Sequence, residues 1–259
     1  MPVIMNDKAV SEAIGFILIL GLVLTGIALI TLYGYPVLVK EQSSADVKNM
    51  ERAMIVIQND MKSLCFKNVP YKESTLQVSG GTLEVIRADD SECYFKITAS
   101  SGPDGEPYDS GELKLGALRY RSDRSTEVIT LENGAVMTRQ EGSTGSAMLA
   151  EPRWFYDEPT KTFVIYLMNI TADERMAKSG MTTVRMKLNN TNTQSYEPGG
   201  PVEVTYTKDT GNDHSVAWRN YLTSPTVGMK LKSGPPDTYE ISGVDKLVIK
   251  EYEIKILGI

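Results

Sequence analysis

The pattern of apolar and polar positions divides the chain into three stretches. Residues 13–39 contain no Lys, Arg, Asp, Glu or His. Residues 40–66 are mostly polar but keep one apolar stripe, in which successive members lie 3 or 4 positions apart: Val47, Met50, Met54, Ile57, Met61 and Leu64. From residue 67 onward, short apolar or alternating runs are separated by Gly, Pro, Asn and Asp. Each of these patterns predicts a different kind of element.

The first stretch predicts a membrane-embedded helix over residues 11–39. At ~1.5 Å per residue, an uninterrupted helix of this length exceeds the ~30 Å of a hydrocarbon core. A helix that is apolar on every side is not expected in water. Four glycines, among them Gly15, are spaced along it and would let another helix approach closely. Pro36 should kink or interrupt the helix near its end.

A cleaved secretory peptide is the alternative interpretation of this stretch. The apolar region of such a peptide is usually ~7–15 residues long and ends in small residues. Here the apolar run is longer and passes through Leu32-Tyr-Gly-Tyr-Pro36. Cleavage after the run is therefore not expected.

The second stretch, residues 40–66, predicts an amphipathic helix that continues the first. Its stripe follows the helical period and would face a core. A coiled-coil seam is the alternative, but it would be only about three heptads long, so packing on the chain's own domain is favoured. Residues 10–66 would then form one long helix.

The third stretch, residues 67–259, predicts a β-rich domain with few helices. Val128–Leu131 and Ala135–Thr138 flank Asn133-Gly134, a strong hairpin signal. Phe163–Met168 is continuously apolar and should be a central strand buried on both faces. Tyr252, Ile254 and Ile256 alternate with charged residues in a last strand. The predicted fold class is therefore α+β: a long helix followed by an antiparallel β-sandwich-like domain.

Composition excludes several classes of chemistry. The formal net charge of −6 and a pI of about 5.1 argue against nucleic acid as a partner. With one histidine and two cysteines, the chain offers few ligands for zinc and one candidate for a Ser-His-Asp triad. That candidate, His214, lies in a polar stretch and is interpreted as an ordinary loop residue. No catalytic residue, metal site or cofactor is expected, although paired carboxylates of a secreted enzyme leave no signature in sequence.

Cys65 and Cys93 are interpreted as one disulfide of an exported domain, which would join the end of the long helix to an early strand. The alternative is two buried free thiols. Asn169-Ile-Thr171 and Asn189-Asn-Thr191 match the N-x-[ST] acceptor pattern, so Asn169 and Asn189 are candidate N-glycosylation sites if the domain lies outside the cell.

Two polar or aromatic features have a functional and a structural interpretation. The loop 100–112 carries four carboxylates that could hold calcium, but its spacing is not that of an EF-hand, so a solvated acidic loop is favoured. Trp154-Phe-Tyr156 and Trp218 could form a carbohydrate platform. At strand spacing, however, such aromatic residues more often belong to the core.

The residues before the apolar helix resemble a known family. Asp7-Lys8-Ala9-Val10-Ser11-Glu12-Ala13-Ile14-Gly15 is similar to the N-terminus of archaeal type IV pilin-like proteins with a class III signal peptide. The resemblance covers about 30 residues. It implies that a membrane prepilin peptidase removes residues 1–9, with Lys8 and Ala9 closing the leader and Val10 beginning the mature chain. Many relatives have Pro where Glu12 stands, so the cleavage position is predicted only to within one or two residues.

Glu12 has two interpretations. Ser11 can cap the helix and a carboxylate in the first turn complements the helix dipole, which is worth under about 1 kcal/mol. In a filament, Glu12 would instead pair with the free amine of Val10 in a neighbouring subunit. The first interpretation is favoured.

The sequence thus predicts a non-enzymatic, pilin-like subunit of a cell-surface filament, used for adhesion or as a surface structure. The size of the β-domain fits a minor or tip subunit at least as well as a bulk one. Its partners would be membrane lipid, the prepilin peptidase, other pilin subunits and the assembly platform. The domain 67–259 would be extracellular. The alternative is a permanently anchored extracellular β-domain that acts as a binding or envelope module without assembling.

Overall fold

The computed structural model describes residues 7–67, 69–100, 107–209, 211–232 and 237–259, and the side chains of residues 7–11 and 13 lie outside that description. The chain divides into two compact units, residues 1–45 and 46–259. The described part of the first unit is helical throughout. It consists of α1 (Asp7–Leu29), a π-helical turn η1 (Ile30–Gly34) and the start of α2 (Tyr35–Lys67).

The π-helical turn lies directly before Pro36, where the sequence predicts an interruption. Proline lacks the N–H that would bond to the carbonyl four residues earlier, and its ring crowds that carbonyl. Tyr35 donates its N–H to the carbonyl of Ile30, five residues back, which is the hydrogen bond of a π turn. The wider turn accommodates the proline, and the helical path continues to Lys67 as expected for one long helix.

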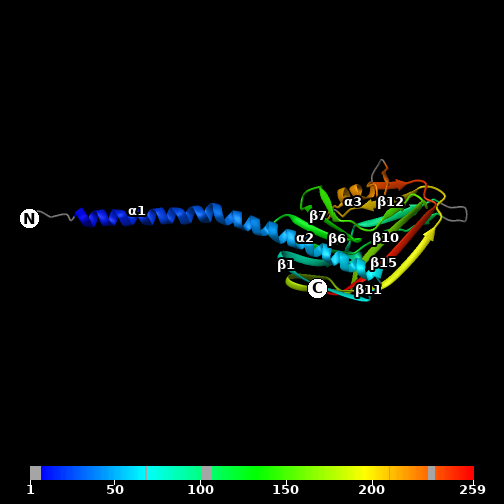
Figure 1. Ribbon diagram of the computed structural model, residues 1–259, viewed down its shortest axis with the longest axis horizontal. Helices are drawn as coiled ribbons and strands as arrows, with labels where there is room; N and C mark the ends of the chain where they lie inside the picture. The colour runs from blue at the N-terminus through cyan, green and yellow to red at the C-terminus, as the bar shows by residue number, and fades with distance from the viewer. Residues whose placement is uncertain (1–6, 68, 101–106, 210, 233–236) are drawn as a thin grey trace, which may run out of the picture. The chain divides into compact units, whose positions relative to one another are not determined.

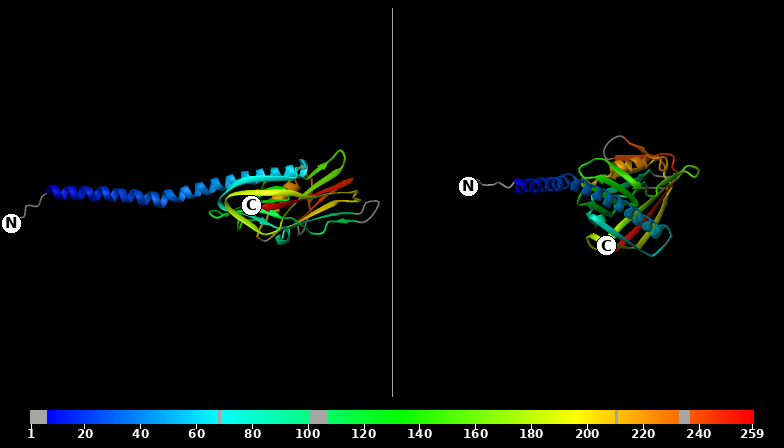
Figure 2. Two further views of the ribbon diagram at one scale, coloured as in Figure 1. Left: turned by 90° about the horizontal axis from the view of Figure 1, so that it is seen from below. Right: turned by 60° about the vertical axis from the view of Figure 1, so that its left-hand side comes forward.

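The second unit contains the rest of α2 and the β-rich domain. The apolar stripe of α2 is buried, with 8% or less of each side chain exposed at all six positions, and belongs to the domain core. This confirms the prediction that the stripe faces the chain's own domain. Gln58, also buried, donates from its amide to the carbonyl of Gly134 (2.5 Å) and to that of Glu151 (3.1 Å). Figures 1 and 2 show this part of α2 lying along one face of the large sheet.

The large sheet has nine strands in the order β8-β7-β6-β5-β1-β11-β15-β10-β9. In chain order they are β1 (Tyr71–Ile86), β5 (Ala117–Ser122), β6 (Glu127–Glu132), β7 (Ala135–Gln140), β8 (Ser146–Ala150), β9 (Phe155–Asp157), β10 (Thr162–Ala172), β11 (Met176–Tyr196) and β15 (Lys246–Gly258). Neighbouring strands of this described sheet run antiparallel except β10 and β15, which are parallel. The predicted antiparallel arrangement therefore holds for the described pairs of this sheet except β10 and β15. A parallel pair needs a long crossover, and the chain between β10 and β15 supplies it.

The smaller sheet has the order β13-β14-β12-β2-β3, with β4 also paired to β2. Its strands are β2 (Tyr94–Ala99), β3 (Tyr108–Asp109), β4 (Leu113–Lys114), β12 (Val202–Thr207), β13 (Lys230–Leu231) and β14 (Asp237–Ile241). In the described part of the chain after residue 70, helical structure is limited to α3 (Ser215–Leu222) and a 3₁₀ turn, η2 (Ala88–Asp90). The fold is therefore α+β, with a mostly antiparallel β-domain.

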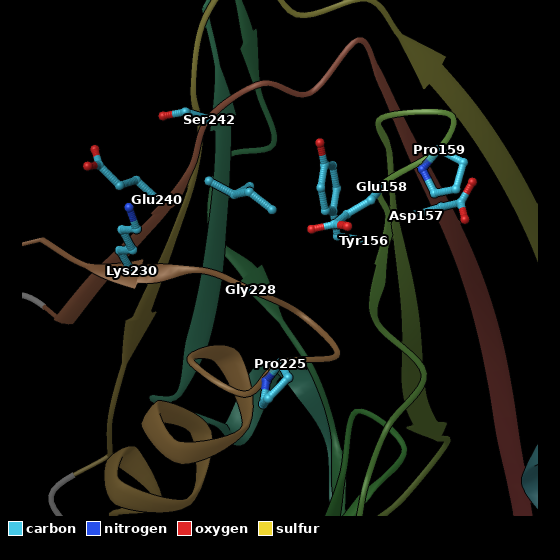
Figure 3. Close-up of a pocket in the computed structure, with 10 residues that line it drawn as sticks. Tyr156, Asp157, Glu158, Pro159, Pro225, Gly228, Lys230, Glu240 and Ser242 are labelled. Atoms are coloured by element: carbon cyan, nitrogen blue, oxygen red, sulfur yellow. The ribbon is translucent and has the colours of Figure 1, made fainter.

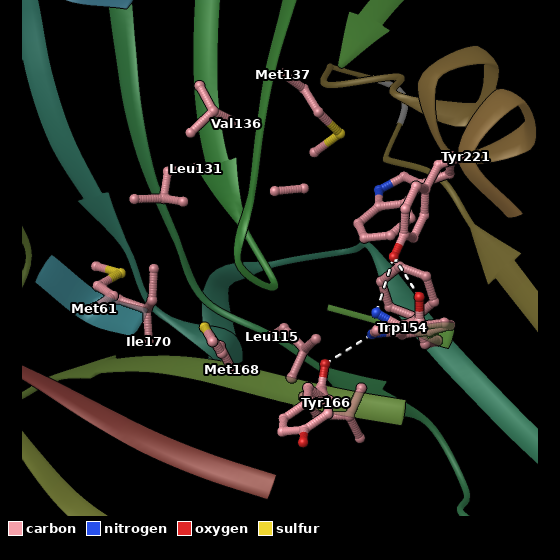
Figure 4. Packing of buried hydrophobic residues seen from close by; sticks show 14 of the residues in the cluster. Met61, Leu115, Leu131, Val136, Met137, Trp154, Tyr166, Met168, Ile170 and Tyr221 are labelled. Carbon is pink, nitrogen blue, oxygen red and sulfur yellow. Dashed lines mark hydrogen bonds between the residues drawn. The ribbon is translucent and has the colours of Figure 1, made fainter. Parts of the chain in front are cut away.

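Both sheets and α3 contribute to one hydrophobic core. Phe95 of β2, Trp154 before β9 and Trp218 of α3 pack with their rings 4.8–6.0 Å apart. Trp154 donates from Nε1 to the carbonyl of Tyr166 (2.7 Å) and from its backbone N–H to the hydroxyl of Tyr221 (2.9 Å), as Figure 4 shows. The two tryptophans are thus core residues, which the sequence favoured over a carbohydrate platform.

Several local predictions are confirmed. β6 and β7 form the expected hairpin, and Asn133 (φ 49°) and Gly134 (φ 71°) adopt the left-handed backbone of a two-residue turn. Phe163–Met168 is buried at every position in β10. That strand is second from the sheet edge rather than central. The first strand, β1, begins at Tyr71, four residues after the end of α2.

Candidate functional site

The most exposed apolar surface of the described chain lies on the first unit. Leu18, Ile19 and Leu20 follow one another around the helix, about 100° apart, and are 68%, 66% and 44% exposed. The other large apolar residues from Ile14 to Leu38 are exposed as well. Apolar surface on all sides of a helix is stable only in lipid or among other apolar helices. The described residues contain one helix long and apolar enough to cross a membrane.

The surface of this helix also suits close packing. A Cβ atom added at Gly15, Gly21 or Gly26 would meet no atom within 4 Å beyond the adjoining residues and backbone of its own helix, so each glycine leaves an open notch. The hydroxyl of Thr25 donates to the carbonyl of Gly21 (2.7 Å) and that of Thr31 to the carbonyl of Ile27 (2.9 Å). Because these hydroxyls are satisfied within the helix, they need no water.

The residues assigned to leader processing lie at the start of α1. Lys8, Ala9 and Val10 have helical backbone, as does Ser11 at the expected helix start, and the side chains of these four residues are outside the described set. Residues 1–6 of the expected leader lie outside the described residues. Glu12 is exposed. Its role, in capping or in subunit contact, stays a prediction.

Cys65 and Cys93 are free, buried thiols, which corrects the expected disulfide. Cys65 is on the last turn of α2, and burial raises the pKa of its thiol to about 12. Cys93 lies between η2 and β2, where its sulfur accepts the N–H of Asp209 (3.2 Å) and contacts the hydroxyl of Tyr206 (3.7 Å). Each thiol thus fills a different part of the core, as small apolar residues do.

The two candidate glycosylation sites differ in exposure. Asn169 is half-buried in β10, and its Oδ1 accepts the N–H of Gly116 (3.3 Å). Asn189 is exposed at an irregularity in the pairing of β11 with β15 and donates to Glu253 (2.9 Å). Of the two, Asn189 is the more accessible to a modifying enzyme.

The acidic loop and the histidine have structural roles where they are described. Asp104 and Glu106 lie outside the described residues. Asp109 pairs with Lys96 (2.9 Å) and accepts the N–H of Gly111 (2.8 Å). Within the described ranges no cluster of three or more His, Cys, Asp or Glu side chains could hold a metal ion. His214 is fully buried beside α3 rather than in an open loop.

A buried polar cluster was not visible in the sequence. Glu132, at the end of β6, is 2% exposed, and burial raises the pKa of its carboxyl to about 7 although Arg119 opposes this rise. Burial lowers the pKa of His214 to about 3, and the nearby Arg139 and Arg119 lower it further. Arg139 in turn donates to the carbonyl of Gly211 (2.6 Å). The alternating pattern of a strand suggests which residues share a face, but not that a second segment covers that face.

The β-domain also has a cavity of about 600 Å³ at the edges of its two sheets. It is lined by residues from β9, β13, β14 and the turns beside them: Tyr156, Asp157, Glu158, Pro159, Pro225, Gly228, Lys230, Glu240, Ile241 and Ser242. Figure 3 shows Tyr156 and Glu158 on one side, with Lys230 and Glu240 on the other. The two segments that meet here are 66 or more positions apart, so no local pattern could indicate the cavity.

Comparison with known proteins places both units in one family. Residues 8–255 match the family described as "Family of unknown function (DUF7289)". The chain belongs to this family. The DUF7289 match runs through the apolar helix and the β-domain alike, so the two units together are characteristic of the family.

One relative among the curated proteins is an uncharacterized protein of Archaeoglobus fulgidus. It is 23% identical over 222 residues, which cover 72% of this chain and 72% of the relative. No solved structure matches the chain.

Proposed function

We propose that this DUF7289 protein is a membrane-inserted, pilin-like subunit of a type IV pilus-like filament at the cell surface. The observation that carries the proposal is the fully exposed apolar helix that continues into the buried stripe of α2. The apolar part can reside in lipid before assembly and among copies of itself afterwards, since both environments exclude water. The β-domain would form the outer surface and serve adhesion or structure.

Three further features support the proposal. The notches at Gly15, Gly21 and Gly26 would allow neighbouring helices to approach. Residues 7–15 resemble the processing site of archaeal pilin-like proteins. The apolar helix is part of the family match, as expected of a functional element rather than a removable signal. In this proposal a prepilin peptidase cuts between Ala9 and Val10, and the assembly platform extracts the subunit from the membrane.

The test is the mass of the mature N-terminus in protein isolated from its native membrane. The proposal predicts a chain that begins at Val10 or within two residues of it. Ala9→Phe should block the cut by placing a bulky side chain at the processing site, whereas the neighbouring Asp7→Asn should leave it unchanged. A mature chain that begins at Met1, or beyond Tyr35, would contradict the proposal.

A permanently anchored binding or envelope module is the second candidate, since the same helix could remain in lipid as a monomer. Leu22→Cys distinguishes the two, because Leu22 is 76% exposed on the apolar helix and both native cysteines are buried. A filament should give thiol-crosslinked dimers at that position, because one accessible thiol per subunit joins two subunits. A permanent anchor should give none, and Met54→Cys on the buried stripe should give none in either case.

A further inference from the structure

The cavity at the edges of the two sheets is independent of the apolar helix. It lies between β9, at the edge of the large sheet, and β13–β14, at the edge of the smaller one. Its volume of about 600 Å³ is within the roughly 300–1,000 Å³ of small-molecule sites. Figure 3 shows its lining side chains around an open space.

Tyr156 is held in place on one wall of this cavity. Its backbone N–H donates to the carbonyl of Thr226 (3.1 Å), and its hydroxyl donates to the carbonyl of Gly243 (2.9 Å). The ring is therefore fixed between the turn after α3 and the turn after β14. A ligand that packs on the ring would not need to order it first, which lowers the entropic cost of binding.

The polar groups of the cavity are available to a ligand. In the described part of the chain, the side chains of Glu158, Lys230 and Glu240 make no hydrogen bond or ion pair shorter than 4 Å. Glu158 and Lys230 are exposed and Glu240 is half-buried. Asp157 differs, because its carboxylate already accepts the hydroxyl of Thr160.

The charges restrict what the cavity can hold. Three carboxylates and one ammonium line it, so an anionic ligand would be repelled. The carboxylates do not belong to any described cluster suited to a metal ion. Carboxylates accept hydrogen bonds from hydroxyls, an ammonium donates to them, and an aromatic ring packs on apolar C–H surface.

We propose that this cavity binds a neutral oligosaccharide, with Glu158, Glu240 and Lys230 bonding to sugar hydroxyls and Tyr156 packing on a sugar face. A sugar combines many hydroxyls with apolar C–H faces and carries no charge, which fits this lining. The inference concerns the β-domain alone and holds for a filament subunit and for an anchored module. Its test and the test of leader processing therefore succeed or fail separately.

The experiment uses the full-length protein in micelles of a detergent without a sugar head group. The probes are three neutral trisaccharides (cellotriose, mannotriose and the trimer of N-acetylglucosamine), the anionic trimer of galacturonic acid, and the cation spermidine. Binding is measured by saturation-transfer NMR and by calorimetric titration. At least one neutral trisaccharide should bind, and the galacturonic acid trimer should not.

Variants connect the binding to this cavity. Tyr156→Ala and the double variant Glu158→Gln/Glu240→Gln should each weaken trisaccharide binding at least 10-fold, and Tyr156→Phe, which keeps the ring, should weaken it less. Glu174→Gln is the control, because Glu174 is exposed and outside the cavity. The glutamine variants alter no buried group and should keep the wild-type melting temperature. Three outcomes would each overturn the proposal. They are binding of spermidine alone, no binding of any neutral probe at about 10 mM, and trisaccharide binding that stays at the wild-type level in Tyr156→Ala and in the double glutamine variant.

Discussion

The two units of the chain differ in whether their apolar side chains are exposed or buried. In residues 14–38, Leu, Ile and Val side chains point outward on all sides of the helix and remain exposed. In residues 46–259, the apolar side chains of α2 and the strands form one buried core. The β-domain therefore obtains its hydrophobic stabilisation from its own chain, whereas the first unit must obtain it from lipid or from other helices.

The largest expected effect comes from separating the units. A chain limited to residues 46–259 keeps the stripe of α2 and the described core, so it should fold and remain in solution. The full chain should sediment with membranes, because burial of its apolar helix in lipid is favourable. Fractionation by ultracentrifugation and circular dichroism of the soluble fraction measure both outcomes. An aggregated or unfolded short chain would show that the β-domain needs residues 1–45 for its stability.

Equal truncations in the two units should differ in effect. Met54→Ala removes a fully buried side chain of the stripe and should lower the free energy of unfolding of the β-domain by about 2–5 kcal/mol. Leu22→Ala removes an exposed side chain and should leave that free energy unchanged. Urea unfolding followed by the fluorescence of the buried Trp154 and Trp218 reports on the β-domain. Equal losses in both variants would mean that the units are not energetically separate.

The buried polar cluster should make the stability of the β-domain depend on pH. The pKa of Glu132 is raised from 4.5 to about 7 in the folded state, so the stabilisation from its protonated form is complete below pH 4.5 and is lost as the pH rises through 7. The largest loss is about 3 kcal/mol. The pKa of His214 is lowered from 6.5 to about 3, so its contribution is present above pH 6.5 and is lost as the pH falls toward 3.

Glu132→Gln separates these opposing effects. The variant cannot ionise at this position, so its stability should rise from pH 3 to pH 6.5 with the His214 contribution and then stay level. In the wild type the two effects nearly cancel between pH 4.5 and pH 6.5. The free energy of unfolding of the wild type should therefore fall by about 3 kcal/mol relative to that of the variant between pH 4.5 and pH 7. The measurement is urea unfolding at intervals from pH 3 to pH 8. Glu174→Gln, at an exposed position, serves as the matched control and should follow the wild type. A wild-type curve that runs parallel to the variant curve from pH 4.5 to pH 7 would exclude a raised pKa of Glu132 in the folded core.

The smallest expected effect concerns the thiols. Because Cys65 and Cys93 are free and buried, reductant should change neither the melting temperature nor the gel mobility. Both thiols should react with an alkylating reagent in denaturant and resist it in the native protein, since burial and raised pKa values suppress thiolate. One disulfide found by peptide mass mapping would reverse this assignment.

Local patterns predicted the elements that depend on neighbouring residues. The long helix, the buried stripe and the hairpin at Asn133-Gly134 each follow from periodicity or turn chemistry within about 15 positions. The burial of Phe163–Met168 followed from its uninterrupted apolar run. These features need no knowledge of which distant segments meet.

Features that depend on distant segments were missed or mistaken. The parallel pairing of β10 with β15 joins Phe163 to Leu247, and nothing in either segment specifies its direction. The cysteines suggested a bridge because they are two in number, yet each lies in its own part of the core. Tyr156 was noted as part of an aromatic run, but its partners in the cavity come from residues 225–242. The apolar helix, in contrast, could be predicted from the sequence alone, since its apolar residues form one uninterrupted run.

The hairpin turn between β6 and β7 controls how readily Asn133 can deamidate. Asn-Gly bonds deamidate readily when the glycine nitrogen can reach the asparagine side chain, and most such turns are on the surface. Here Asn133 is fully buried, and its Oδ1 accepts the N–H of Met168 (3.0 Å), while the carbonyl of Gly134 accepts from Gln58. The reaction therefore requires α2 and β10 to separate from the turn. Deamidation at Asn133 would then record, as a permanent change of one mass unit, how often this core has opened.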